Sequence, residues 1–315
     1  MLSGVSVVTY AMRVKNELAR LELGNNCCQQ AELMAFIHLC GNLQISDKQV
    51  ALNVVTSNPA VARRIFKLFK SVFQLSSELL VQKKIKLRKN NVYLIRISGA
   101  NRVRKVLTGL GLLRDGILTQ KLDLPKLAEK CCRRAYLRGA FLSAGSILNP
   151  ENSYHLEIYS DSQQHAENIA ALIKTFAIKV KITERKNGYM VYLKDSEQIA
   201  DFLNVIGAHA ALLDFENVRI LKDLRNRINR LVNFETANVT KTVKAAVRQA
   251  QAIKAIAEHI GLESLSPPLR ELAYLRLEHP EASLVELGQM LQPPLSKSGV
   301  NHRMRRLEKI GRKFL

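Results

Sequence analysis

The chain has 315 residues, of which 47% are hydrophobic and 24% charged, with 48 Lys and Arg against 27 Asp and Glu. This composition is typical of a soluble globular protein with two or more domains, and no stretch reaches the ~20 apolar residues of a membrane span. The net charge of +21 favours a polyanionic partner, double-stranded DNA, over a merely solvating surface. RNA is a weaker candidate because only 6% of the residues are aromatic.

Two segments of the first 210 residues repeat one pattern. Residues 27–43 align without gaps with residues 131–147, an offset of 104. Further on, Tyr93 aligns with Tyr189, an offset of 96, so the first copy holds eight more residues. Such self-similarity predicts a duplicated unit.

In chain order, each copy is predicted to have the element order α-β-α-β-β-α, giving an α+β fold of tandem pseudo-twofold repeats. The first copy follows an opening helix near 12–22 and has a helix at 27–41, a strand at 50–56, a helix at 59–73, strands at 79–87 and 92–97, and a helix ending near 110. The second copy has a helix at 125–145, a strand at 154–160, a helix at 161–176, strands at 178–185 and 189–194, and a helix at 196–206.

The eight extra residues fall in the second hairpin of the first copy, between residues 81 and 91. Lys84, Lys86 and Arg88 alternate onto one strand face, and Lys83 and Lys89 add to the charge. A two-stranded ribbon with a cationic face fits a major groove, so these five residues are a candidate secondary DNA contact. The alternative is a charged edge strand that discourages aggregation.

Charge is distributed unevenly along the chain. Residues 1–109 carry 17 basic and 5 acidic groups (+12), residues 110–214 carry 13 and 12 (+1), and residues 215–315 carry 18 and 10 (+8). The first repeat and the C-terminal part are therefore the basic surfaces.

Beyond Asp214 the pattern becomes helical throughout. Apolar residues at helical spacing predict one helix over 218–231 and another over 239–260, the second with a regular four-three spacing. Such a seam is compatible with a coiled-coil dimer, but an intramolecular packing helix is the favoured reading. A monomer is accordingly favoured, and the oligomeric state stays open.

The last 50 residues have the pattern of a helix-turn-helix. A helix over 268–277 is followed by a second that Ser283 caps, with Glu286 at its capping-box position, and by a third that Ser296 caps. Short polar groups and Arg or Asn on the third helix suit base edges, with further cations on phosphates. A generic three-helix bundle is the alternative. The candidate DNA-binding residues are Ser283, Ser296, Lys297, Ser298, Asn301, His302, Arg303, Arg305, Arg306 and Lys309.

Residues 136–147 resemble the dodecapeptide motif of LAGLIDADG homing endonucleases. In that family, two motif helices pack at a pseudo-twofold axis, and an acidic residue before the final Gly holds the catalytic metals. Those positions are Cys40 and Ala144 here. Because Mg²⁺ requires oxygen ligands, the resemblance implies no catalytic residues, no metal and no cofactor.

Five cysteines with no CxxC pair and no signal peptide favour reduced thiols in the cytoplasm. Two pairs, at 27–28 and 131–132, are adjacent in the sequence. Adjacent helical residues point about 100° apart, so buried small residues are preferred to a metal site.

The whole chain resembles the WhiA family of bacterial regulators. A segment similar to that family's linker contains Asn226, Arg227, Asn229, Arg230, Asn233, Glu235, Asn238, Lys241 and Thr242. The resemblance implies a transcriptional regulator associated with sporulation in actinomycetes and with cell division and chromosome segregation in other Gram-positive bacteria.

The expected organisation is an N-terminal extension with the opening helix (1–23), two LAGLIDADG-like repeats (24–112 and 113–213), linker helices (214–262) and a helix-turn-helix domain (263–315). The expected function is non-enzymatic, sequence-specific DNA binding at the cytoplasmic nucleoid, with no membrane partner. One alternative is an adaptor that docks RNA polymerase or another regulator through the near-neutral second repeat. Another alternative is a residual endonuclease.

Overall fold

The computed structural model describes residues 8–46, 49–83, 91–119, 122 and 124–315. The chain forms two compact units, here called unit 1, up to Lys222, and unit 2, from Asp223. In the described part of the chain, no helix has the length and apolar character that crossing a membrane requires.

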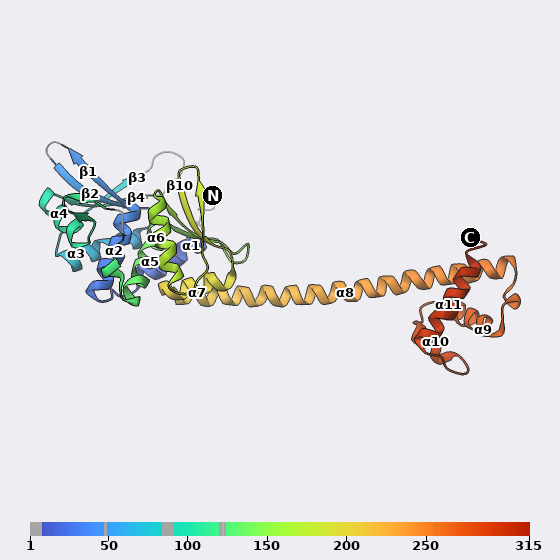
Figure 1. Ribbon diagram of the computed structural model, residues 1–315. Coiled ribbons are helices and arrows are strands. Elements are labelled where there is room, and N and C mark those ends of the chain that lie inside the picture. Colours follow the sequence, from blue (N-terminus) through green and yellow to red (C-terminus); the bar gives the residue numbers. More distant parts are fainter. Residues whose placement is uncertain (1–7, 47–48, 84–90, 120–121, 123) are drawn as a thin grey trace, which may run out of the picture. The chain divides into compact units, whose positions relative to one another are not determined.

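Unit 1 contains the two repeats (Figure 1). After the opening helix α1 (Tyr10–Arg20), the first repeat comprises α2 (Asn26–Cys40), β1 (Gly41–Ser46), β2 (Gln49–Thr56), α3 (Pro59–Phe73), β3 (Glu78–Lys83), β4 (Asn91–Ser98) and α4 (Ala100–Gly109). A short hairpin of β5 (Leu113–Arg114) and β6 (Ile117–Leu118) leads to η1 (Leu124–Leu127) and the second repeat. That repeat comprises α5 (Lys130–Ala144), β7 (Gly145–Ile147), β8 (Leu156–Ser160), α6 (Gln163–Lys174), β9 (Lys181–Arg185), β10 (Gly188–Leu193) and α7 (Ser196–Ile206).

The two repeats share one sheet topology, which confirms the tandem α+β fold. Their antiparallel sheets have the strand orders β1-β2-β4-β3 and β7-β8-β10-β9. The predicted order α-β-α-β-β-α omits β1 and β7, so each repeat is α-β-β-α-β-β-α. Both strands lie at a sheet edge, where β1 is mostly exposed and β7 has only three residues, so neither has the apolar alternation that marks a strand in a sequence. The helix predicted over 125–145 is likewise two elements, η1 and α5.

Helices α2 and α5 pack against each other in the core of unit 1. Every residue from Leu33 to Ile37 is buried, as expected of a helix with apolar contacts on all sides. The two backbones approach closely at Gly139, where a Cβ atom would lie 2.6 Å from the carbonyl oxygen of Glu32 and 3.0 Å from the Cβ of Ala35. The small residue in the motif is therefore required by the packing of the two helices.

Helix α8 (His209–His259) is continuous over 51 residues, although the sequence pattern predicted two helices. No Gly or Pro interrupts these residues, and the first helix breaker is Gly261, with a φ of 77°. At its C-terminal end Ile253 and Ile256 are buried in the core of unit 2, whereas Val243 is 55% exposed. The predicted intramolecular packing is thus confirmed for the last turns of α8.

Unit 2 continues with η2 (Leu262–Ser264), α9 (Pro267–Glu278), α10 (Leu284–Met290) and α11 (Lys297–Gly311), which confirms the three predicted helices. The predicted capping box is also present, because the Ser283 hydroxyl accepts from the Glu286 amide and the Glu286 carboxylate accepts from the Ser283 amide at 2.7 Å. Between α10 and α11 the chain turns back onto Gly288, where a Cβ atom would lie 2.3 Å from the Leu295 carbonyl oxygen. This close approach sets the turn that positions α11.

Candidate nucleic-acid interface

Helix α11 presents a polar face to solvent. Ser296 caps its N-terminus by accepting a hydrogen bond from the Gly299 amide at 3.3 Å. On the inward side Val300, Met304 and Leu307 are fully buried in the unit 2 core. On the outward side, the exposed residues recur every three or four positions and form a stripe, here called the α11 stripe: Ser298, His302, Arg305 and Lys309.

The other predicted contact residues lie beside this stripe or support it. Lys297 and Arg306 are exposed, and Asn301 is half-buried. Arg303 donates to the carbonyl oxygen of Pro268 at 3.5 Å, and the Ser283 hydroxyl is occupied as a helix cap. In the free protein, Arg303 and Ser283 therefore make structural hydrogen bonds, and the α11 stripe with Lys297 and Arg306 is the available surface.

Two arginines hold α11 and its neighbours in place. Arg276 is buried, and its Nη1 donates to the carbonyl oxygen of Ala282 at 2.6 Å, in the connection between α9 and α10. Arg248 of α8 lies 3.3 Å from the carboxylate of Glu308, on the inner side of α11. The sequence gives no local signal for either contact, because the partners are brought together only by the packed helices.

The positions of the lost catalytic acids lie at the C-terminal ends of the motif helices. Cys40 ends α2 and Ala144 ends α5. Lys15 of α1 is the charged group beside Cys40. Burial lowers the pKa of Lys15 to about 8, and the neighbouring Cys40 opposes that shift. A protonated lysine repels a divalent cation.

A second polar group, His38, lies in α2 two residues before Cys40. The His38 Nδ1 atom lies 2.9 Å from the Tyr136 hydroxyl, which in turn lies 2.6 Å from His165 Nε2. Burial lowers the pKa of His38 to about 3, with the neighbouring His165 adding to the shift. Burial also lowers the pKa of His165 to about 4. The network is therefore neutral at pH 7, and it was not predicted.

Glu32, the carboxylate nearest the motif, is buried, and arginine side chains balance its negative charge. Arg64 of α3 donates to both Glu32 oxygens, with Nη2 at 2.9 Å from Oε2. Arg138 of α5 lies 3.6 Å from the same oxygen. Glu32 thus links α2, α3 and α5 and is unavailable to a metal.

Among the described residues, the only cluster of His, Cys, Asp or Glu side chains with metal-ligand spacing is made by four cysteines at the other end of α2 and α5. Cys27 and Cys131 are exposed there, so their interpretation as buried small residues is wrong. That interpretation considered each helix alone and missed their convergence.

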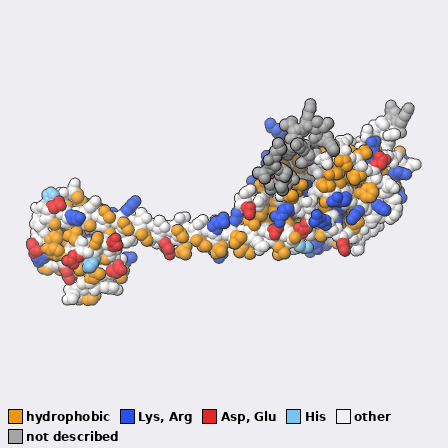
Figure 2. All heavy atoms as spheres, turned by 180° about the vertical axis from the view of Figure 1, so that it is seen from behind, with side chains coloured by type: hydrophobic (Ala, Val, Ile, Leu, Met, Phe, Trp, Pro, Cys, Tyr) orange, Lys and Arg blue, Asp and Glu red, His pale blue; other side chains and the backbone are white. Residues whose placement is uncertain are grey.

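Among the described residues of the first repeat, most Lys and Arg lie on helices. Figure 2 shows Lys and Arg side chains across unit 1, and the exposed helical cations include Arg63, Lys67 and Lys70 of α3 and Arg102 and Arg104 of α4. Part of the outer face of the sheet presents neutral groups, which line a shallow pocket: Asn42, Leu43, Gln44, Ile45, Asn53, Val55 and Leu94. Arg96 and Glu78 lie on the same face, because Arg96 pairs in register with both Asn53 and Glu78.

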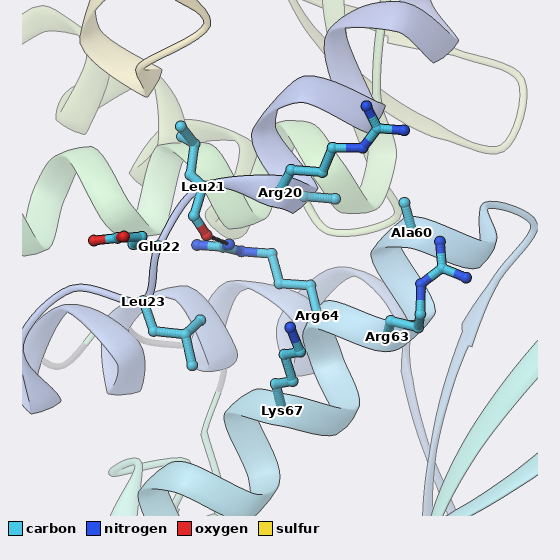
Figure 3. Close-up of a pocket in the computed structure, with 9 residues that line it drawn as sticks. Arg20, Leu21, Glu22, Leu23, Ala60, Arg63, Arg64 and Lys67 are labelled. Carbon is cyan, nitrogen blue, oxygen red and sulfur yellow. Dashed lines mark hydrogen bonds between the residues drawn. The ribbon is translucent and has the colours of Figure 1, made fainter.

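One cationic pocket, of about 320 Å³, lies between α1 and α3 (Figure 3). Arg20, Arg63 and Lys67 line it, whereas the Arg64 guanidinium is directed inward to the Leu21 carbonyl and to Glu32. Glu22 lines the same pocket, so its lining carries both signs of charge with a positive balance.

Of the five cations of the candidate ribbon, the structure describes only the first, Lys83. Lys83 ends β3, which is the edge strand of its sheet. Lys84, Lys86, Arg88 and Lys89 lie outside the described residues, so a groove contact by the ribbon stays a prediction.

The residues of the predicted linker signature all lie on α8, and all are exposed: Asn226, Arg227, Asn229, Arg230, Asn233, Glu235, Asn238, Lys241 and Thr242. Apolar side chains of the same stretch are exposed as well, from Ile228 at 51% to Phe234 at 65%.

The fold and the site define the class of this protein. It is a LAGLIDADG-like protein with two repeats, without carboxylates at the metal-binding positions, followed by a helix-turn-helix domain. The models of three WhiA domains match it: the N-terminal LAGLIDADG-like domain at residues 26–113, the LAGLIDADG-like domain at 133–225 and the C-terminal HTH domain at 228–311. The chain belongs to the WhiA family, as its sequence predicted.

Relatives match over almost the full chain. A protein of Desulforamulus reducens is 51% identical over 98% of this chain and 96% of its own length. One of Desulfitobacterium hafniense is 49% identical over 98% and 96%. Both are named probable cell division protein WhiA.

A solved structure confirms the fold over the same extent. The crystal structure of full-length WhiA from Thermatoga maritima has a TM-score of 0.57 and 28% identity, covering 98% of each chain. The N-terminal LAGLIDADG domain of WhiA, at 24% identity, has a TM-score of 0.51 over 65% of this chain and 94% of its own. The tandem repeats and the C-terminal HTH domain are thereby confirmed.

Proposed function

We propose that this chain is a non-enzymatic, sequence-specific DNA-binding regulator of transcription that reads base edges with α11. The observation that carries the proposal is the α11 stripe, an exposed row of groups that can donate or accept hydrogen bonds, on a helix whose other side is buried. An Arg at this place can form a bidentate pair with guanine, and Asn301 can form one with adenine. Lys297 and Arg306 flank the stripe where phosphates would lie.

The proposal of a non-enzymatic role rests on the chemistry at the ends of α2 and α5. Cys40 and Ala144 supply no hard oxygen ligand, and Lys15 adds a positive charge beside Cys40. Glu32 is already bound by two arginines. The duplicated fold would then contribute DNA or partner binding rather than strand cleavage.

The cellular role follows from the relatives. Both relatives carry a cell-division name, and we extend that role to this chain, with genes of chromosome segregation or sporulation under its control. Sequence-specific DNA binding would place the protein on the nucleoid.

Selection of binding sites from random duplexes tests this function. The full-length chain should enrich one sequence motif, and Arg305→Ala should lose the preference at one base position. Lys254→Ala, an exposed cation of unit 2 on α8, is the charge-matched control and should retain the motif. If the motif of Arg305→Ala is identical to that of the unchanged protein, α11 does not read the bases as proposed.

Supercoiled plasmid containing the selected site tests the absence of cleavage. With Mg²⁺ or Mn²⁺ the protein should leave the plasmid intact. A residual endonuclease would be established instead by two results together. The nicking activity would co-purify with the protein, and the Arg305→Ala variant would still nick non-specific DNA.

A second function, docking of RNA polymerase, is favoured by the second repeat. Its segment has a net charge of only +1, and its sheet exposes an apolar group at Tyr159. Binding of purified RNA polymerase to the full chain, lost on Tyr159→Asp but kept in Arg305→Ala, would establish this adaptor role. Retention in Tyr159→Asp would exclude this face of the second repeat as the docking surface.

A further inference from the structure

Four cysteine side chains meet where α2 and α5 begin. The Sγ atoms of Cys27, Cys28, Cys131 and Cys132 all lie within 4.8 Å of one another. Cys27 and Cys131 are exposed, Cys28 is half-buried and Cys132 is buried. The cluster therefore has a protein-facing side and a side open to solvent, through which an ion can enter.

The duplication explains how adjacent cysteines come together. In each repeat the pair occupies the second and third residues of its helix, after Asn26 in α2 and after Lys130 in α5. Since the two helices pack side by side, the pairs face each other across the junction of the repeats. Adjacent side chains diverge on one helix, yet Cys131 Sγ and Cys132 Sγ are only 4.0 Å apart, and the second helix completes the set.

The spacing fits a single tetrahedral ion. Four thiolates bound to Zn²⁺ at about 2.3 Å lie about 3.8 Å from one another, which a small rotation of these side chains reaches from the present distances. Iron–sulfur clusters distribute their cysteine ligands over two or more irons and set the sulfurs farther apart. Soft thiolates in tetrahedral geometry select Zn²⁺ over Mg²⁺ or Ca²⁺.

The surroundings suit the charge of such a site. Four thiolates around Zn²⁺ carry a net charge of about −2, and each helix N-terminus contributes roughly half a positive charge with free amide groups. Arg138, on the next turns of α5, interacts with the charge of Cys28. The cluster lies about 18 Å along α2 from Cys40, so it is separate from the lost catalytic positions.

We propose that Cys27, Cys28, Cys131 and Cys132 bind one Zn²⁺ as a structural site that ties the first repeat to the second. The ion joins the N-terminal ends of α2 and α5, whose middle parts are already held together at Gly139 and Ala35. It is bound by four protein ligands, so it has no open position for catalysis.

The test uses the full-length chain, produced without a polyhistidine tag and purified under reducing conditions. Mass-spectrometric metal analysis should find one Zn²⁺ per chain. After chelation, titration with Co²⁺ should give the visible absorption and the sulfur-to-metal charge transfer of a tetrahedral tetrathiolate site. Removal of Zn²⁺ should lower the melting temperature of unit 1.

Two serine variants locate the site. Cys27→Ser/Cys131→Ser changes only exposed cysteines, so it should fold but lose both the Zn²⁺ and the tetrathiolate spectrum. Cys40→Ser is the matched control, because it removes the fifth cysteine and should keep both.

The proposal is overturned if the wild-type chain carries no metal and gives no thiolate charge transfer with Co²⁺. It is also overturned if intact mass shows a disulfide between the pairs, if the metal is iron, or if Cys40→Ser loses Zn²⁺ as the double variant does. The Co²⁺ spectrum of the wild-type chain decides the matter even if a variant fails to fold.

Discussion

The motif helices of unit 1 and helix α11 of unit 2 differ in where they keep their polar groups. In the middle of α2 and α5 several polar groups are buried and neutral or paired, as in the His38–Tyr136–His165 network and the Glu32–Arg64 pair. In α11 most polar groups are exposed, and the buried side is apolar apart from Glu308. A helix without its catalytic acids can thus be kept for its packing contacts. A helix proposed to contact DNA bases depends instead on its exposed side chains.

Removal of Glu32 should have the largest effect on this comparison. Glu32→Ala leaves Arg64 buried without its partner, which should cost about 3 to 5 kcal/mol of the free energy of unfolding of unit 1. Hydrogen exchange in increasing urea, resolved by segment, should show the loss in α2, α3 and α5 and none in α11.

The control is Arg13→Ala, which removes an exposed ion pair with Asp214 in the same unit. It should cost at most about 1 kcal/mol. Equal losses for the two variants would mean that the buried pair does not hold the motif helices.

The buried histidines should make unit 1 sensitive to acid. The pKa values of His38 and His165, about 3 and about 4, lie below the unfolded value of about 6.5, so between these values the unfolded chain binds more protons. Their contribution is complete above pH 6.5 and is lost as the pH falls. Between pH 7 and pH 5 each should reduce the unfolding free energy by about 2 kcal/mol.

Urea unfolding at both pH values measures this loss. The His165→Gln variant should show a smaller difference between the two pH values, and His302→Gln, at an exposed site of unit 2, should show the unchanged difference. An unaltered pH dependence in His165→Gln would contradict a neutral network.

Arg305→Ala should weaken binding of a selected site by about 1 to 3 kcal/mol and relax the preference at one base. Arg306→Ala, which lies where phosphates would be, should weaken all sequences alike and reduce the salt dependence of binding. Binding titrations on the selected site and on one-base variants separate the two. The assignment fails if Arg305→Ala weakens every sequence equally.

Loss of the α11 cap should have the smallest effect. Ser296→Ala removes the acceptor for the Gly299 amide and should cost unit 2 about 1 kcal/mol of stability. Ser298→Ala, also exposed but at the second residue of the helix and not its cap, should change stability by less than about 0.5 kcal/mol. Thermal unfolding followed over unit 2 measures both, and a larger effect at Ser298 would place the cap elsewhere.

Much of the fold could be predicted because it rests on local signals. The duplication, the boundaries of α3 and the capping box of α10 follow from periodicity and caps. The edge strands β1 and β7 could not, because exposed short strands carry no apolar alternation. The continuity of α8 was missed although no Gly or Pro interrupts it, because a change in apolar periodicity was read as a break.

The candidate site also has parts that the sequence could predict and parts that it could not. The α11 stripe is one face of one helix, so its spacing shows in the sequence. The Tyr136 network joins residues 98 and 29 positions apart, and the four-cysteine cluster joins two repeats, so each requires the tertiary arrangement. Polar residues at core positions of the duplicated helices, such as His38 and Glu32, were the available signal.

Genome-wide occupancy of the tagged protein tests most directly the claim that α11 reads DNA while the duplicated scaffold does not cut it. The wild-type chain should occupy discrete sites that share one sequence motif, with no strand breaks at those sites. An Asn301→Ala/Arg305→Ala variant, folded and expressed at the same level, should lose these sites. Unchanged occupancy in that variant, or breaks at the occupied sites, would contradict the account.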